Sequence, residues 1–194
     1  MTKPQLDSRQ RMVLAAADML ARHGLNATSI RELAKRADAP LGSTYHHFPS
    51  GKHQVVVEAI ALAGARVDAG LDQHLRSGAR AGLGEFLAAW RNVLLQSRFR
   101  IGCPVMAAAI DEPLDEDSDA PREAAAGVFD GWRRRLERAF MSEGLGEDAA
   151  TDLATLVIAS MEGAVVLCRA ERSIDPFDRI ARQIEAVAMS QLRA

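Results

Sequence analysis

Residues 29–48 of the chain read SIRELAKRADAPLGSTYHHF, and they predict two short helices joined by a tight turn. Ser29 and Glu32 have the spacing of a helix capping box, and apolar side chains follow at intervals that make one apolar face. Asp38 tolerates turn conformations that bulkier residues avoid, and Pro40 has the φ angle of a first helical position. The stretch is therefore predicted to be a helix-turn-helix.

The second of these helices, expected at 40–47, has a composition typical of a helix that contacts a partner. Gly42 lets the backbone approach a surface closely, and hydroxyl and imidazole groups follow that can reach phosphates or base edges. These groups belong to Ser43, Tyr45, His46 and His47. Thr44 and Phe48, four residues apart, are expected to point inward. The pattern indicates double-stranded DNA as the partner.

Residues 9–60 resemble the DNA-binding domain of the TetR family of transcriptional repressors. The resemblance rests on His23-Gly24, 28–34 (TSIRELA), 42–48 (GSTYHHF) and Lys52. It implies that the residues contacting DNA are Arg31, Pro40, Leu41, Gly42, Ser43, Tyr45, His46, His47 and Lys52.

Two further segments resemble the LmrA/YxaF-like branch of this family. They are the insertion 49–51 (PSG) and the segment 102–105 (GCPV). Members of that branch respond to drug-like ligands, so the resemblance implies a ligand-responsive repressor.

Three positions depart from the family pattern. Asp38 stands where the turn usually has Gly, and Leu41 stands where a Lys often reaches a phosphate. The site is therefore expected either to bind the DNA backbone more weakly or to read a base methyl group at Leu41. Thr44 replaces a commoner aliphatic anchor, and its hydroxyl is expected to bond back to the Pro40 carbonyl.

The composition predicts an all-α fold of about nine helices. The 194 residues are 48% hydrophobic but only 5% aromatic, and no run of alternating β-branched residues occurs. We expect a three-helix, helix-turn-helix DNA-binding domain at 1–52, followed by a larger helical ligand-binding and dimerisation domain at 53–194.

Two features are expected between these domains. A long helix at 51–75 is long enough to bridge them. The stretch 76–82 is rich in Gly and polar residues and is predicted to be a linker, so the next helix is placed at 83–97.

Charge is distributed unevenly along the chain. Residues 1–60 contain eight Lys or Arg and five Asp or Glu. The remainder of the chain contains sixteen Lys or Arg and twenty-one Asp or Glu. A basic N-terminal domain on an acidic body is typical of a DNA-binding domain whose body stays off the phosphate backbone.

The chain has no signal-peptide pattern, and Glu162 interrupts its longest apolar run. We therefore expect a cytoplasmic protein without membrane contact. Cys103 and Cys168 form no C-x-x-C pair and are interpreted as small buried hydrophobes, so no metal site and no cofactor is expected.

Two charged stretches of the body are interpreted as solvated surface. Six acids lie in 111–119, but the spacing lacks the central Gly and closing Glu of a calcium loop. Four arginines lie in 133–138, and pairing with Glu137 and other acids is favoured over a second nucleic-acid site.

Most aromatic residues lie in the middle of the body, where an aromatic-lined ligand cavity is implied by the resemblance. The side chains expected to line it are Trp90, Met106, Trp132 and Met161. Glu162 lies inside an apolar helix and must meet an arginine, backbone donors or a ligand cation, with an arginine of the preceding helix favoured.

The last two helices, expected at 147–170 and 176–192, predict a homodimer. The first of them has apolar side chains on nearly all sides, and one monomer is not expected to cover so large an apolar surface. A four-helix bundle across a two-fold axis is the simplest solution, and the family resemblance implies it too.

The function predicted is a ligand-responsive DNA-binding regulator, most simply a repressor that a small, largely apolar or drug-like effector releases from a palindromic operator. The alternative is a helical small-molecule-binding or catalytic protein without DNA binding, in which Ser43, His46 and His47 are reactive. No acid is spaced to orient either histidine, so we expect no enzyme activity and no catalytic residues.

Overall fold

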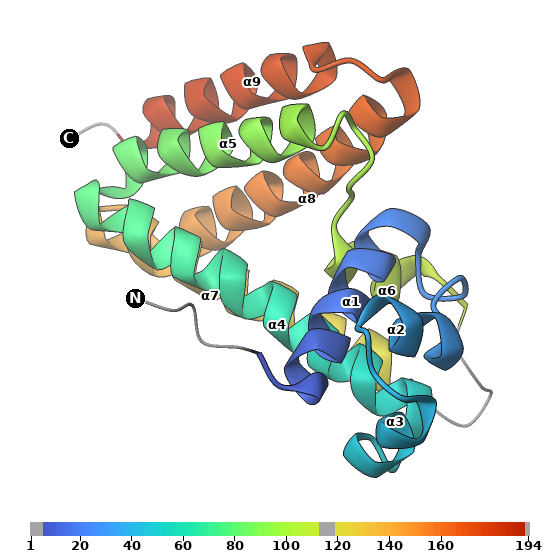
Figure 1. Ribbon diagram of the computed structural model, residues 1–194. Coiled ribbons are helices and arrows are strands. Elements are labelled where there is room, and N and C mark those ends of the chain that lie inside the picture. The colour runs from blue at the N-terminus through green and yellow to red at the C-terminus, as the bar shows by residue number, and fades with distance from the viewer. Residues whose placement is uncertain (1–5, 113–118, 193–194) are drawn as a thin grey trace, which may run out of the picture. The chain divides into compact units, whose positions relative to one another are not determined.

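The computed structural model describes residues 6–112 and 119–192, which form nine α-helices, a short 3-10 helix and no strand (Figure 1). The helices are α1 Ser8–His23, α2 Ile30–Arg36, α3 Leu41–His47, α4 Gly51–His74, α5 Ala79–Gln96, α6 Pro104–Ile110, α7 Ala120–Ser142, α8 Glu147–Glu171 and α9 Asp175–Gln191. The 3-10 helix η1 is Leu75–Ser77. The predicted fold class and the number of helices are confirmed.

The described residues divide into two compact units. The boundaries of unit one are Met1–Gly64 and Cys103–Val128, and those of unit two are Ala65–Gly102 and Phe129–Ala194. The helices α4 and α7 contribute residues to both units. Because this division follows packing, the functional boundary between residues 52 and 53 stays a prediction.

In unit one, α1, α2 and α3 pack on one another. Met12, Leu33 and Phe48 are fully buried between them, so Phe48 is the large core side chain that the sequence predicted. Ser29 caps α2 by accepting a hydrogen bond from Glu32 N at 3.2 Å, but the predicted return bond is absent from the described contacts. The Glu32 carboxylate pairs instead with an arginine one turn later on the same helix.

A complete capping box, which the sequence analysis does not predict, occurs at α1. The Asp7 carboxylate accepts from Gln10 N, and the Gln10 side chain accepts from Asp7 N. These two hydrogen bonds satisfy backbone N–H groups at the start of α1, the helix against which α2 and α3 pack.

The short helix α6 packs against α1 within unit one. Asp111, which follows α6, accepts a hydrogen bond from Leu25 N at 2.6 Å. Gly24 has φ +80°, and a Cβ there would lie 2.7 Å from the Asp111 carboxylate. This acid therefore fastens α6 to the turn after α1, unlike the solvated role that the sequence indicated; residues 113–118 of that acidic stretch lie outside the described residues.

In unit two, α9 lies along α5 and α8 (Figure 1). It buries Phe177, Ile184 and Ala188, and its C-cap residue Leu192 is buried as well. The helix α8 buries one apolar face and exposes another, as its all-round apolar sequence predicted. Among the described helices it is the one long and apolar enough to cross a membrane, judged by length and composition alone, a test that core helices of soluble proteins also pass.

The predictions for the two cysteines and for the linker have different outcomes. Cys103 and Cys168 are both buried, as expected of small hydrophobes. The linker predicted at 76–82 is wrong in its second half, because α5 begins at Ala79, four residues before the expected start. Gly82 explains the difference: a Cβ there would lie 2.5 Å from the His74 carbonyl oxygen, so its missing side chain permits close packing of α5 on η1.

We expect Gly82→Ala to lower the free energy of unfolding by about 1–3 kcal/mol, because the added methyl group must displace backbone atoms. The matched control is Gly70→Ala in α4, where an added Cβ meets nothing within 4 Å. That variant should gain about 0.5–1 kcal/mol from helix propensity. Urea unfolding at one fixed protein concentration measures both, and a neutral Gly82→Ala would contradict the close-packing role.

Candidate functional site

The surface of α3 and its flanks carries all nine residues that the sequence predicted to contact DNA, and all nine lie in unit one. The exposed ones are Arg31, Pro40, Leu41, Gly42, Tyr45 and His46. Ser43, His47 and Lys52 are half-buried. Tyr45 is 61% exposed, which excludes a core role for the only tyrosine of the chain. The structure thus gathers one predicted set on one small domain.

The inner side of α3 is held by the two predicted anchors. Thr44 and Phe48 are both fully buried. The Thr44 hydroxyl donates to the Met12 sulfur at 3.8 Å, so the predicted bond to the Pro40 carbonyl is wrong; that carbonyl accepts from the Ser43 backbone at 2.9 Å. Threonine therefore serves as an anchor because α1 supplies a polarisable acceptor in the core.

An arginine of α1 also contacts the anchor. The Arg9 guanidinium lies 5.3 Å from the centroid of the Phe48 ring and pairs with Glu58 at 2.6 Å. The contact is a cation–π interaction, which covers the end of α3.

The turn between α2 and α3 is held by Arg11. Asp38 adopts φ +48°, which confirms the turn conformation expected of it. Arg11 donates from Nε to the Ala37 carbonyl at 2.8 Å and from a terminal nitrogen to the Asp38 carbonyl at 3.2 Å. Carbonyl groups at the C-terminus of a helix have no N–H donor within the helix, and here the Arg11 guanidinium donates to them instead. The periodicity of α1 assigns Arg11 to its outer face and gave no sign of this role.

The two histidines of α3 are adjacent and diverge. Their ring centroids lie 5.5 Å apart with an interplanar angle of 61°. Among the described residues no group of three or more His, Cys, Asp or Glu is arranged to hold a metal ion. The His46 imidazole is exposed, while His47 lies edge-on to the buried Phe48 ring.

Lys52 occupies the second position of α4 and is half-buried. Burial lowers the pKa of its ammonium group, because the surrounding protein removes water from the charge. A phosphate placed beside the ammonium would oppose this shift. The position therefore favours an anion.

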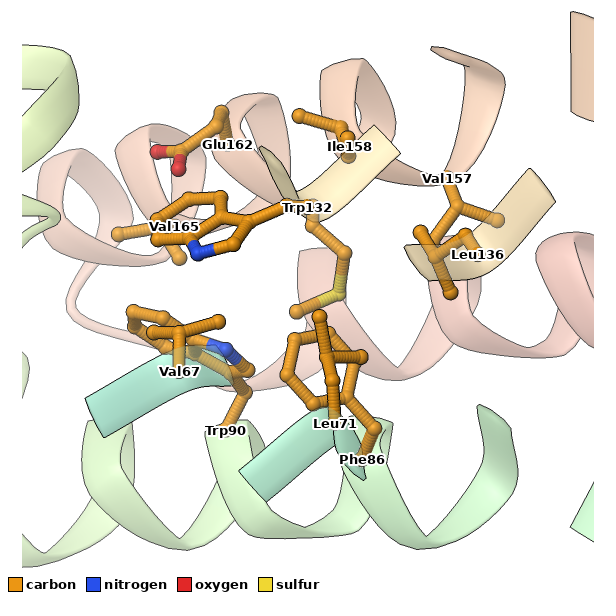
Figure 2. A pocket seen from close by; sticks show the side chains of 11 residues that line it. Val67, Leu71, Phe86, Trp90, Trp132, Leu136, Val157, Ile158, Glu162 and Val165 are labelled. Atoms are coloured by element: carbon orange, nitrogen blue, oxygen red, sulfur yellow. The ribbon is translucent and has the colours of Figure 1, made fainter. Parts of the chain in front are cut away.

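Unit two contains a cavity lined by residues of α4, α5, α7 and α8 (Figure 2). Trp90, Trp132 and Met161 line it together, although they come from three different helices. Met106, the fourth residue predicted for a ligand cavity, is not among the lining residues; it lies on α6, in unit one. The sequence could not show that α6 packs with α1.

The cavity is narrow and largely apolar. A water-sized sphere can occupy about 20 Å³ of it, room for roughly one water molecule. Glu162 is the one ionisable residue among those that line it. The Trp132 ring is fixed by an edge-to-face contact with Phe129, with ring centroids 5.4 Å apart.

Three of the four arginines at 133–138 of α7 pair with acids, as the sequence predicted. Arg133 pairs with Asp130 at 2.5 Å and also with Glu137. Arg135 reaches Asp68 at 3.0 Å, but burial still raises the pKa of that carboxyl group. Most of the positive charge of the cluster is therefore paired with acids, which argues against a second nucleic-acid site.

Comparison with known proteins agrees with this geometry. Residues 13–59 match the family model "Bacterial regulatory proteins, tetR family", and residues 79–183 match "Transcriptional regulator LmrA/YxaF-like, C-terminal domain". The HTH-type transcriptional regulator Rv0196 of Mycobacterium tuberculosis is 35% identical over 187 residues, covering 95% of each chain. The regulator YxaF of Bacillus subtilis is 29% identical over 185 residues, covering 92% of this chain and 93% of YxaF.

Solved structures show the same fold. The regulatory protein TetR from Rhodobacter sphaeroides aligns with a TM-score of 0.82 and 26% identity, covering 92% of this chain and 97% of that one. A TetR transcriptional regulator from Legionella pneumophila aligns with a TM-score of 0.85 and 19% identity, over 95% and 99% of the two chains. The resemblance drawn from the sequence is confirmed.

Arg11→Met should lower the free energy of unfolding by about 1–3 kcal/mol, since it leaves turn carbonyls without their charged donor while keeping the apolar stem. Binding to duplex DNA should weaken roughly tenfold through lost preorganisation of α3. The slope of log affinity against log salt should stay unchanged, because Arg11 is not expected to neutralise a phosphate.

The control for this variant is Lys35→Met, which removes the same charge from an exposed site on α2. Its stability should stay within about 0.5 kcal/mol of the original chain. Urea unfolding and salt-dependent fluorescence anisotropy measure these quantities. Equal stabilities for the two variants would remove the proposed role of Arg11.

Proposed function

The chain belongs to the TetR family of bacterial transcriptional regulators, and we propose that it is a homodimeric repressor that a small effector releases from a palindromic operator. The chain is accordingly a DNA-binding regulator and not an enzyme, which removes the catalytic alternative for Ser43, His46 and His47. The proposal rests on one observation: α3 exposes polar side chains on its outer side, while the buried residues Thr44 and Phe48 hold its inner side.

In this proposal α3 enters the major groove of DNA. Its short polar side chains reach base edges, with His46 and Ser43 as the readers, while Gly42 lets the backbone approach closely. The residues assigned to phosphates are Arg31, Tyr45, His47 and Lys52. Pro40, the N-cap of α3, and Leu41, its first residue, contact the groove wall.

The effector is proposed to bind the cavity of unit two, against Trp90, Trp132 and Met161. The helix α4 links this event to the DNA, because Val67 and Leu71 of its second half line the cavity while Lys52 lies at its start. A change of side-chain packing around the effector would then bias the position of the DNA-contacting end. Met106 has no part in this proposal, because it lies on α6 in unit one and does not line the cavity.

A second copy of the chain is proposed to cover the exposed apolar face of α8. The face contains Leu156, Ala159, Gly163, Val166, Leu167 and Ala170, all of which are exposed. Apart from the adjacent pair Val166 and Leu167, these residues follow one another at intervals of three or four. Met189 of α9 is also exposed. Small residues within the face permit close helix approach, and two copies of α8 and α9 would form a four-helix bundle. Such a dimer acts in the cytoplasm, where the operator lies.

The direct test is footprinting of the purified chain on the DNA upstream of its own gene and of neighbouring genes. We expect protection of a palindrome whose half-sites lie about 34 Å apart, one helical turn, or a multiple of that distance. A monomer that binds scrambled duplex as tightly as every upstream fragment would contradict the proposal.

Leu167→Glu should convert the dimer to a monomer, because it places a charge in the apolar face of α8. Palindrome affinity should fall with it, since two half-sites are no longer bound together. The control is Met141→Glu, an equally exposed methionine at the end of α7. Sedimentation velocity distinguishes the two; dissociation by both variants, or by neither, would argue against this interface.

Leu41→Lys should add one phosphate contact per subunit, because Leu41 is exposed at the first position of α3. For a dimer, the slope of log affinity against log salt should steepen by roughly 1.8. Leu41→Gln is the control of similar length and should leave the slope unchanged. If both variants lose specific binding with the original slope, Leu41 reads a thymine methyl group instead.

A further inference from the structure

We propose that the cavity of unit two selects an organic cation, with the Glu162 carboxylate and the two indole rings as its binding groups. This inference rests on the proposed function in one respect, since it names the chemical class of the effector. The class expected is a small amine or quaternary ammonium compound that carries alkyl or aryl groups.

The charge of the lining carries the first step. Glu162 is the one ionisable side chain among the lining residues, and its Oε2 atom is buried. A carboxylate in an apolar wall attracts a cation strongly, because the surrounding side chains screen charge far less than water does. The same carboxylate repels carboxylate, phosphate and sulfate ligands.

The aromatic walls carry the second step. Trp90, Trp132 and Phe86 line the cavity, and the face of an indole attracts a cation more strongly than any other side-chain ring. Figure 2 shows Glu162 on the same side of the cavity as Trp132, with Trp90 across from them. A cation between the indoles would therefore meet the carboxylate and π faces together.

The remaining lining fixes the hydrocarbon part of the ligand. The other side chains are aliphatic or methionine, and they offer no hydrogen bonds to a sugar or a nucleotide. The present space of about 20 Å³ is smaller than any such ligand, so binding must displace side chains. Met161 is the flexible lining residue that can yield at the lowest strain.

The chain itself supplies the reporter for the experiment. It contains two tryptophans, and both line this cavity, so intrinsic tryptophan fluorescence reports on the site. The probes are benzyltrimethylammonium, its uncharged carbon analogue neopentylbenzene, and the anion phenylacetate. We expect benzyltrimethylammonium to bind about 10- to 100-fold more tightly than neopentylbenzene, and phenylacetate to bind least.

Two variants locate the source of that preference. Glu162→Gln keeps the shape and removes the charge, and it should abolish most of the preference for the cation while leaving neopentylbenzene binding unchanged. Asp152→Asn removes the same charge from an exposed site on the same helix and should leave the preference intact. If Glu162→Gln does not fold, the comparison of the three probes on the unaltered chain still decides.

The proposal is overturned if neopentylbenzene binds as tightly as the cation, if phenylacetate binds best, or if no probe binds at millimolar concentration. Footprinting on the same preparation separates this outcome from failure of the proposed function. If the chain binds an operator but does not prefer the cation, the proposed regulator function stands and the cation-site proposal is wrong. If it prefers the cation but binds no operator, the cation-site proposal stands and the proposed regulator function is wrong.

Discussion

The hydrogen bonds from Arg11 to the α2–α3 turn are the contacts on which the proposed DNA-contacting surface depends. The helix α3 has seven residues, too few to be stable alone, and only Thr44 and Phe48 hold its inner side. Its outer side must stay polar and exposed to serve a partner. Orientation must therefore come from the flanks, where the guanidinium fixes the turn carbonyls and Arg9 covers the Phe48 ring.

Local signals in the sequence predicted most of the fold and the outer surface of the candidate site. Helix caps and apolar spacing act within one turn, so Ser29 and Phe48 could be assigned before any tertiary contact was known. The contacts that were missed join distant residues: Arg11 to the turn, and Asp111 to Leu25 N. Neither has a signature in its own neighbourhood, because an arginine or an acid on an exposed-looking face is normally solvated.

Unit two follows a different constraint, since α8 is apolar on two faces. Phe177 and Ile184 are among the α9 residues buried in this unit, where α9 packs along α8, and the other face of α8 remains exposed. A chain that exposes so continuous an apolar face is expected to associate. The glycine and alanines within the face limit its depth, which favours another helix over a bulky ligand as its cover.

The cavity and the proposed DNA-contacting end share α4, and this limits how an effector can act. A ligand shifts an equilibrium only by the difference in its affinity for the two arrangements, so tight binding alone is not sufficient. Because the space available is about 20 Å³, an effector must repack the lining, which includes Val67 and Leu71 of α4. The attraction between a bound cation and Glu162 can offset the free-energy cost of that repacking. A neutral apolar ligand must offset the same cost through contact area alone, in a site that has little room.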